Sequence, residues 1–180
     1  ISHGDNSIEQ HFPSRSGLDR VTKGIIMYNQ PVYHEILNSD GTTKETIALL
    51  FLDTPGLFDT NTDQHSTMLI YGLTSLISSV ILYNMDKVIS EDHLQNIALF
   101  SEYTEFVKKQ FPDAKFKPLQ KLFMIIRDFQ CLDDEIKEDE YLEQILDGRD
   151  SKELDTTRSS IRNAYEYIGC HFLPHPGFEA

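Results

Sequence analysis

Three short segments of the sequence carry residue types that could bind a nucleotide. The first is Asp53-Thr54-Pro55-Gly56, which directly follows an apolar run. An aspartate there can reach a hydrated Mg²⁺, and the amide of Gly56 can approach a terminal phosphate because no side chain intervenes. The same residues also suit an ordinary turn between a strand and a helix. Turn statistics favour that alternative when the segment is taken alone.

The second segment is Arg127-Asp128-Phe129, after the apolar run 121–126. A carboxylate at Asp128 can accept two hydrogen bonds from guanine, one from the ring N–H and one from the exocyclic amine. Adenine offers no matching pair of donors, so the contact would select guanine. The alternative is an exposed ion pair worth less than about 1 kcal/mol. Taken singly, this segment also favours the alternative.

The third segment contains Thr22 within a glycine-containing stretch, residues 15–24. A threonine hydroxyl beside a flexible loop is suited to coordinate Mg²⁺ when the loop closes on a triphosphate. A solvated loop with a threonine that begins a strand is the alternative. None of the three segments decides the function by itself.

Strand-like and helix-like blocks alternate around these segments. Asp40-Gly41 is a hairpin turn signal between the first two strands, and the uninterrupted apolar run 47–52 predicts a strand buried on both faces. Strands are expected over 24–37, 46–52, 80–84, 121–126 and 170–173, and helices over 63–77, 90–110, 140–147 and 151–168. The alternation predicts a three-layer α/β domain with a mostly parallel sheet flanked by helices. Ligands of such sheets bind beyond the carboxyl ends of the strands, where Asp53 and Asp128 are expected.

Charge and cysteine content exclude several classes of function. The 180 residues carry 16 Lys plus Arg against 29 Asp plus Glu, a net charge of −13, of which −8 falls within 131–155. This balance argues against nonspecific binding to nucleic acid or anionic lipid. Two cysteines, Cys131 and Cys170, exclude a disulfide framework and a typical zinc site. Residues 64–85 lack charged side chains but hold several polar ones, so we interpret them as a buried helix followed by a buried strand, not a membrane segment.

The order and separation of the three segments change their interpretation. Thr22-Lys23-Gly24-Ile25, then 52–59, then Ile126-Arg127-Asp128-Phe129 resemble the dynamin-like GTPases of the guanylate-binding protein and atlastin group. Further stretches are similar to the atlastin branch: Phe12 to Thr22, Ser78 to Asn84, Glu91 to Gln95, Leu99 to Tyr103 and Leu173 to Gly177. The similarity covers about residues 12–178, nearly the whole chain.

The resemblance implies a P-loop GTPase fold, with GTP as substrate and Mg²⁺ as cofactor. It makes Thr22 the metal-binding threonine of the first switch, and Asp53 and Gly56 the pair of the second switch. Thr22, Asp53 and Gly56 would thus serve catalysis, with Thr22 and Asp53 at the metal. Arg127 and Asp128 would form the Arg-Asp motif that binds the guanine nucleotide, with Asp128 contacting the base. A separate pair, Arg15 and Arg20, would hold phosphate or contact a second subunit.

The sequence departs from the family in one respect. It contains no G-x-x-x-x-G-K-[ST], the loop that holds the β- and γ-phosphates. In the family that loop and the strand before it precede the first switch. We therefore expect residues 1–180 to form a single partial GTPase domain without its first strand and phosphate loop, and to bind GTP poorly or not at all by themselves.

For the parent protein, the resemblance implies a GTPase that forms homodimers through this domain and drives membrane fusion at the cytoplasmic face of the endoplasmic reticulum. Nucleic acid is not an expected partner, and this chain is not expected to contact the membrane directly. Two alternatives remain open. One is a nucleotide-free, degenerate GTPase-like module for dimerisation or scaffolding, and the other is an unrelated α/β domain.

Overall fold

The fold is that of a computed structural model, which describes residues 22, 24–55, 64–110, 119–129, 136–147, 152–175 and 177. The chain divides into two compact units, Ile1–Ile70 and Tyr71–Ala180, and each is described by itself. Whether residues 1–180 form a single domain stays a prediction.

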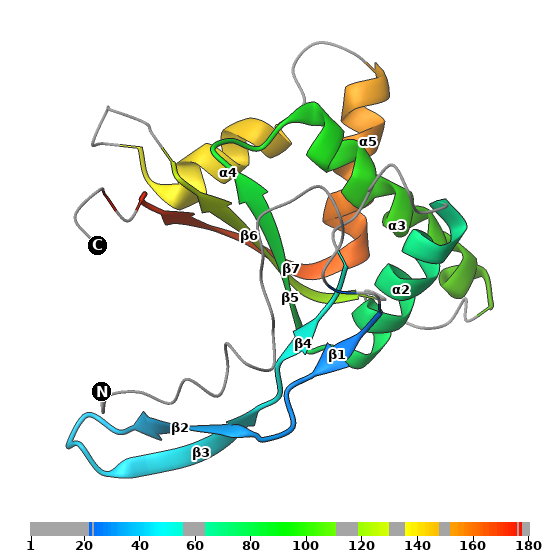
Figure 1. The fold of residues 1–180 in the computed structure, drawn as a ribbon. Coiled ribbons are helices and arrows are strands. Elements are labelled where there is room, and N and C mark those ends of the chain that lie inside the picture. The colour runs from blue at the N-terminus through cyan, green and yellow to red at the C-terminus, as the bar shows by residue number, and fades with distance from the viewer. Residues whose placement is uncertain are drawn as a thin grey trace. The chain divides into compact units, whose positions relative to one another are not determined.

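The first unit contains a long antiparallel hairpin (Figure 1). At its base, β1 (Ile26–Met27) pairs with β4 (Leu52–Asp53), and further out β2 (Val32–Leu37) pairs with β3 (Thr43–Leu49). The predicted turn is confirmed, because Gly41 has a φ of 82° and the amide of Asn38 donates to the carbonyl of Thr42 at 2.8 Å. Asp40 accepts hydrogen bonds from both the amide and the hydroxyl of Thr42, which lower its pKa.

Three expectations for this hairpin are wrong. The predicted strand over 46–52 is divided between β3 and β4, and residues 50 and 51 belong to neither. The predicted strand over 24–37 is divided into β1 and β2, with Pro31 between them. The run 47–52, expected to be buried on both faces, is mostly exposed, including Leu49 and Leu50. The physical reason lies in its pairing: β3 has β2 as its strand partner, and the described part of the first unit packs no helix against either face of this pair.

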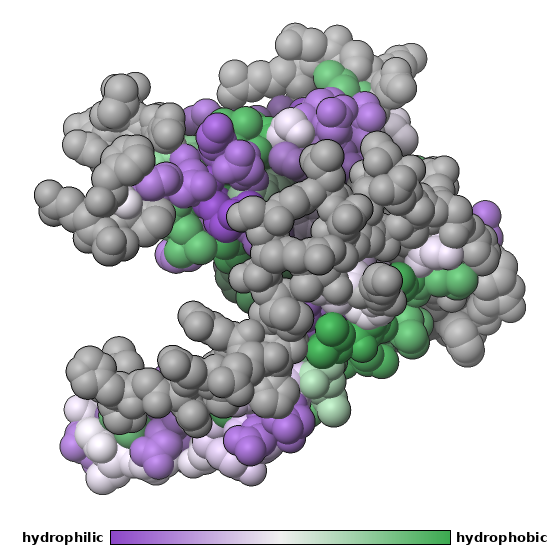
Figure 2. All heavy atoms as spheres, in the orientation of Figure 1, coloured by the Kyte–Doolittle hydropathy of each residue, from purple (hydrophilic) through white to green (hydrophobic). Residues whose placement is uncertain are grey.

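The uncharged stretch begins with helix α2 (Gln64–Ile77), as predicted. Tyr71 and Ser75 are buried, whereas the opposite side of the helix exposes an apolar stripe: Leu69, Leu73, Leu76 and Ile77. The expectation that residues 64–85 are buried is therefore wrong for this side of the helix, and also for Val80 and Leu82 of the strand that follows. Figure 2 shows hydrophobic side chains gathered over this helix. Among the described residues, no helix combines the length and hydrophobicity that a membrane crossing needs.

The second unit contains a parallel sheet of three strands in the order β5 (Val80–Asp86), β6 (Leu119–Arg127) and β7 (Tyr165–Leu173). Three helices connect or follow these strands: α3 (Glu91–Gln110), α4 (Glu138–Leu146) and α5 (Lys152–Ala164). Alternate residues of β6, namely Leu122, Met124 and Ile126, are fully buried against side chains of α3, α4 and α5. The α/β fold with a parallel sheet flanked by helices is therefore confirmed.

The two faces of the three-stranded sheet differ in burial, because the face toward the helices forms the core. The core combines Leu94 and Ile97 of α3 with Leu142 and Leu146 of α4 and Ile161 of α5. Residues of the opposite sheet face are exposed among the described part of the chain: Val80, Leu82, Tyr167 and Leu173. The helices α3, α4 and α5 therefore pack on one face of the three strands.

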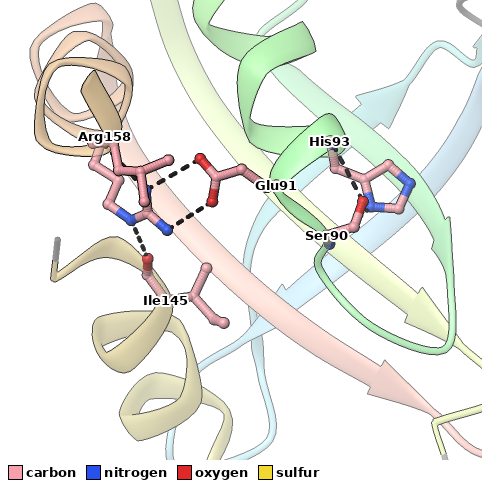
Figure 3. Close-up of polar contacts among 6 residues, drawn as sticks. Ser90, Glu91, His93, Ile145 and Arg158 are labelled. Carbon is pink, nitrogen blue, oxygen red and sulfur yellow. Dashed lines mark hydrogen bonds and ion pairs between the residues drawn. The ribbon is translucent and has the colours of Figure 1, made fainter. Parts of the chain in front are cut away.

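The start of α3 is held by two sets of polar contacts (Figure 3). Ser90 caps the helix, since its hydroxyl accepts from the amide of His93 at 3.4 Å and its own amide donates to His93 Nδ1 at 3.1 Å. Arg158 of α5 donates to both carboxylate oxygens of Glu91 and, through Nε, to the carbonyl of Ile145 at the end of α4. One guanidinium thus joins three helices.

The predicted helix over 151–168 is too long at its C-terminal end. Helix α5 ends at Ala164, and β7 begins at Tyr165, which lies opposite Leu119 in the sheet. Tyr165 is fully buried and its hydroxyl hydrogen-bonds that of Tyr71. Strand pairing and burial of this side chain outweigh the helical spacing of the apolar residues, and Tyr, Tyr and Ile in 165–168 suit a strand.

Candidate functional site

Thr22 and Asp53 lie together at the base of the hairpin. Asp53 ends β4 and pairs with Ile26 of β1, which brings it back to the residues that precede β1. The hydroxyl of Thr22 donates to Asp53 Oδ2 at 2.6 Å, and both side chains are partly buried. The hairpin therefore brings together two oxygen-bearing side chains that are 31 positions apart in the sequence.

Three predicted site residues lie outside the described residues: Arg15, Arg20 and Gly56. Their roles in binding phosphate, in contacting a second subunit and in approaching the γ-phosphate stay predictions. Cys131 also lies outside the described part, while Cys170 is a free, buried thiol whose pKa is raised to about 12 by burial and by the nearby Glu138 and Asp139.

Arg127 and Asp128 lie at the carboxyl end of β6, in the second unit, where the strand order predicts ligand contacts. Asp128 has a φ of 54°, and Lys87, which follows β5, has a φ of 62°. The amide of Lys87 donates to the carbonyl of Arg127 at 2.7 Å, so the two loops are joined directly beyond the ends of neighbouring strands. The Thr22–Asp53 pair belongs to the other unit.

Sequence reasoning gave no role to Asn84, which is a neighbour of Arg127 in the candidate site. Its side-chain oxygen accepts a hydrogen bond of 2.7 Å from Nε of Arg127. Both side chains are exposed, on the sheet face that the helices leave open. An Asn close to the carboxyl end of the strand before Arg127-Asp128 is the signal that could have found it.

The donor set at Thr22 and Asp53 fits Mg²⁺ better than a transition metal. A hydroxyl and a carboxylate are hard oxygen ligands, and Mg²⁺ in phosphate-binding proteins is held by one or two such groups together with substrate oxygens and waters. No cluster of three or more His, Cys, Asp or Glu side chains that could bind a metal occurs in the described ranges. The two oxygens therefore suit a metal that arrives with a phosphate ligand.

Comparison with known sequences shows the family to which the chain belongs. Residues 7–180 match the family model described as guanylate-binding protein, N-terminal domain. The chain belongs to this family. The match confirms the resemblance to the guanylate-binding protein and atlastin group of dynamin-like GTPases.

Several atlastins are similar to this member of the guanylate-binding protein family. Atlastin of Drosophila melanogaster is 31% identical over 180 residues, which cover 97% of the chain and 32% of that protein. Human atlastin-2 is 31% identical over 182 residues, with 98% of the chain and 30% of that protein covered. Bovine atlastin-1 is 29% identical over 174 residues, with 93% and 30% covered. The chain spans about a third of the length of these curated relatives.

Proposed function

We propose that this chain is part of a Mg²⁺-dependent GTPase domain in the complete natural protein. Thr22 and Asp53 hold the metal, Gly56 approaches the γ-phosphate, and Asp128 binds guanine. The observation that carries the proposal is the 2.6 Å hydrogen bond between Thr22 and Asp53. Two residues chosen from separate sequence motifs for the same metal are in contact.

The contact between Thr22 and Asp53 supports binding of a cation by these two side chains together. A threonine that donates its proton to the carboxylate can turn its lone pairs toward an incoming cation, with Asp53 beside it. When bound, Mg²⁺ neutralises charge on the phosphate oxygens during transfer. The chain's own contribution is to keep both oxygens at one place, because β1 and β4 are paired directly beside them.

Guanine selection is assigned to Asp128. Asp128 follows β6 at the carboxyl end of the sheet, where ligands of parallel sheets bind. The side chain of Arg127 beside it donates a hydrogen bond to Asn84. Two hydrogen bonds from guanine N–H groups would satisfy the carboxylate, whereas adenine would leave it unpaired. Arg15 and Arg20 are proposed to hold phosphate or to contact a second subunit.

The wider role that we propose is GTP-driven fusion of endoplasmic reticulum membranes from their cytoplasmic face, with homodimers formed through this domain. The relatives named atlastin support it, because 93 to 98% of the chain is matched in them. Homodimer formation can be measured by light scattering with GTP, GDP and no nucleotide. Dimers that form equally in all three states would contradict a role for GTP.

The metal site can be tested by Thr22→Ala and Thr22→Ser in the complete natural protein. Removing the hydroxyl should lower kcat for GTP at least about 100-fold, as loss of a group that stabilises the transition state commonly does. Thr22→Ser keeps the hydroxyl and should retain most of the activity. Equal activity of the two variants would exclude the metal role.

The base contact can be tested by Asp128→Asn, which tolerates the positive φ at this position. An amide can donate to the second carbonyl of xanthine but cannot accept both guanine protons. Affinity for GTP should fall and affinity for xanthosine triphosphate should rise, each by about 100-fold or more. A wild-type protein that binds no guanine nucleotide would instead support the nucleotide-free module.

A further inference from the structure

Three aromatic rings from different parts of the fold pack together next to the loop that carries Asp128. Phe129 follows it in the chain, Tyr141 belongs to α4, and Phe172 belongs to β7. Phe129 and Phe172 stack with ring centroids 3.8 Å apart and planes 3° from parallel. Tyr141 meets Phe129 and Phe172 edge-on, at 5.8 and 5.4 Å. These three residues are called the aromatic cluster below.

Hydrogen bonds anchor each member of the aromatic cluster to its surroundings. The amide of Phe129 donates to the carbonyl of Leu173 at 3.4 Å, and the amide of Phe172 donates to Glu138 Oε1 at 2.8 Å. The hydroxyl of Tyr141 accepts from the amide of Ile89 at 3.2 Å. The cluster therefore connects the loops after β5 and β6 to α4 and β7.

Asp128 is held from both sides by this arrangement. Before it, the carbonyl of Arg127 accepts a hydrogen bond from the amide of Lys87, and after it the ring of Phe129 is stacked on Phe172. Its φ of 54° is unfavourable for most residues with a side chain and persists where the neighbouring structure fixes it. The backbone of Asp128 is thus fixed by contacts of its two chain neighbours within the protein.

We propose that Phe129 is a positioning residue for guanine selection, which fixes the backbone of Asp128 through its stacking on Phe172. This inference rests on the proposed function. A carboxylate discriminates between guanine and adenine well when it is already held in the binding geometry, because less ordering is needed on binding. Phe129 touches no nucleotide in this scheme. It acts through Asp128.

The test compares Phe129→Leu with Phe129→Tyr in the complete natural protein. Loss of the ring should raise KM for GTP about tenfold, the loss expected when a charged hydrogen bond is weakened. The ratio of kcat/KM for GTP over ATP should fall by a similar factor, while kcat at saturating GTP changes little. Phe129→Tyr keeps the stacked ring and should behave as wild type.

A matched control is Phe123→Leu, the same substitution within β6. Phe123 contacts Tyr167 at a centroid distance of 5.3 Å and, by the alternation of the paired strands, lies on the sheet face opposite to Phe172. It should leave the preference for GTP over ATP unchanged. If Phe129→Leu does not fold, Tyr141→Leu removes the edge-on ring from α4 and should lower the same preference in the same direction.

The outcomes separate this inference from the function on which it rests. A wild-type protein without a preference for GTP would overturn both. A wild-type preference that stays unchanged in folded Phe129→Leu, or in Tyr141→Leu where Phe129→Leu does not fold, would overturn the positioning role alone. A reduced preference in Phe129→Leu that Phe129→Tyr restores would support it.

Discussion

Glu91 and Arg158 face each other across α3 and α5 in a two-point contact, with Nη1 and Nη2 of the guanidinium donating to the two carboxylate oxygens at 3.2 and 2.9 Å. The Arg158 side chain is 13% exposed and that of Glu91 is 35% exposed. We expect Glu91→Ala to lower the free energy of unfolding by about 2 kcal/mol, because a largely buried guanidinium then loses its charged partner.

Urea-induced unfolding would measure this loss, and Glu143→Ala is the matched control. Glu143 also accepts from an arginine of α5, Arg162, but those side chains are 61% and 39% exposed. Its removal should cost less than about 1 kcal/mol, as for exposed ion pairs in general. Losses of equal size would show that burial of Arg158 does not strengthen its contact.

Stability should decline at high pH because Tyr71 and Tyr165 are buried as a hydrogen-bonded pair. Burial raises the pKa of Tyr71 to about 12 and raises the pKa of Tyr165 as well. The folded state therefore keeps these protons when the unfolded state begins to lose them near pH 10. The free energy of unfolding should fall between about pH 10 and 12, by up to about 1.4 kcal/mol per pH unit for each phenol.

Urea unfolding at stepped pH would check this slope. The Tyr71→Phe variant should show a shallower decline than wild type, because one titrating phenol is removed. Tyr33→Phe removes an exposed hydroxyl from β2 and should keep the wild-type slope. Parallel slopes for all three proteins would contradict the role of the buried pair.

A side chain at Gly169 should destabilise the sheet. A Cβ added there would lie 2.8 Å from the ring of Phe123 and 2.9 Å from that of Tyr167, closer than real contacts allow. Gly169→Ala should cost about 1 to 3 kcal/mol, as overpacked sites do.

The comparison for Gly169→Ala is Gly72→Ala in α2, where an added Cβ has no atom within 4 Å. Gly72→Ala should raise stability by about 0.5 to 1 kcal/mol, since alanine favours a helix over glycine. Thermal unfolding of both variants tests the pair of predictions. A loss in Gly72→Ala similar to that in Gly169→Ala would argue against steric contact as the cause.

Asn84 offers a prediction that depends on the proposed function. Asn84→Ala removes the acceptor of Arg127 Nε and should raise KM for GTP about 3- to 10-fold, the range expected for one exposed hydrogen bond. Asn84→Asp keeps an oxygen at this position and should stay near the wild-type value. Steady-state GTP hydrolysis measures both, and an unchanged KM in Asn84→Ala would exclude this contact from nucleotide binding.

Sequence periodicity located β5 and β6 well because their apolar runs are too short and too continuous for an exposed helix. It misplaced the boundary at Tyr165, because Leu154, Ile161, Tyr165 and Ile168 also fit one side of a helix. Pairing of Tyr165 with Leu119 decides that boundary, and such a pairing depends on the whole sheet. The exposure of β3 was missed for a similar reason, since an apolar run does not reveal which elements cover it.

For the candidate site, too, some residues could be selected from the sequence and others needed the fold. Motif spacing was enough to select Thr22, Asp53 and Asp128. It could not reveal the contact between Asn84 and Arg127 or the aromatic cluster, because those contacts arise from the parallel register of three strands and from the packing of α4 on β7. Hydrogen-bonded neighbours that come from distant segments need the fold before they can be named.

The parallel register has a consequence for the order of folding. Val80 pairs with Lys121, and Lys121 pairs with Tyr167, so each strand must find a partner about forty or more positions away. In the β2–β3 hairpin, Leu37 pairs with Thr43 across a short turn. Closing long loops is slower than closing short ones, so the hairpin should form early and the three-stranded sheet late. The loops that carry Asp128 and Phe129 would then take their native form only when the last strand has joined.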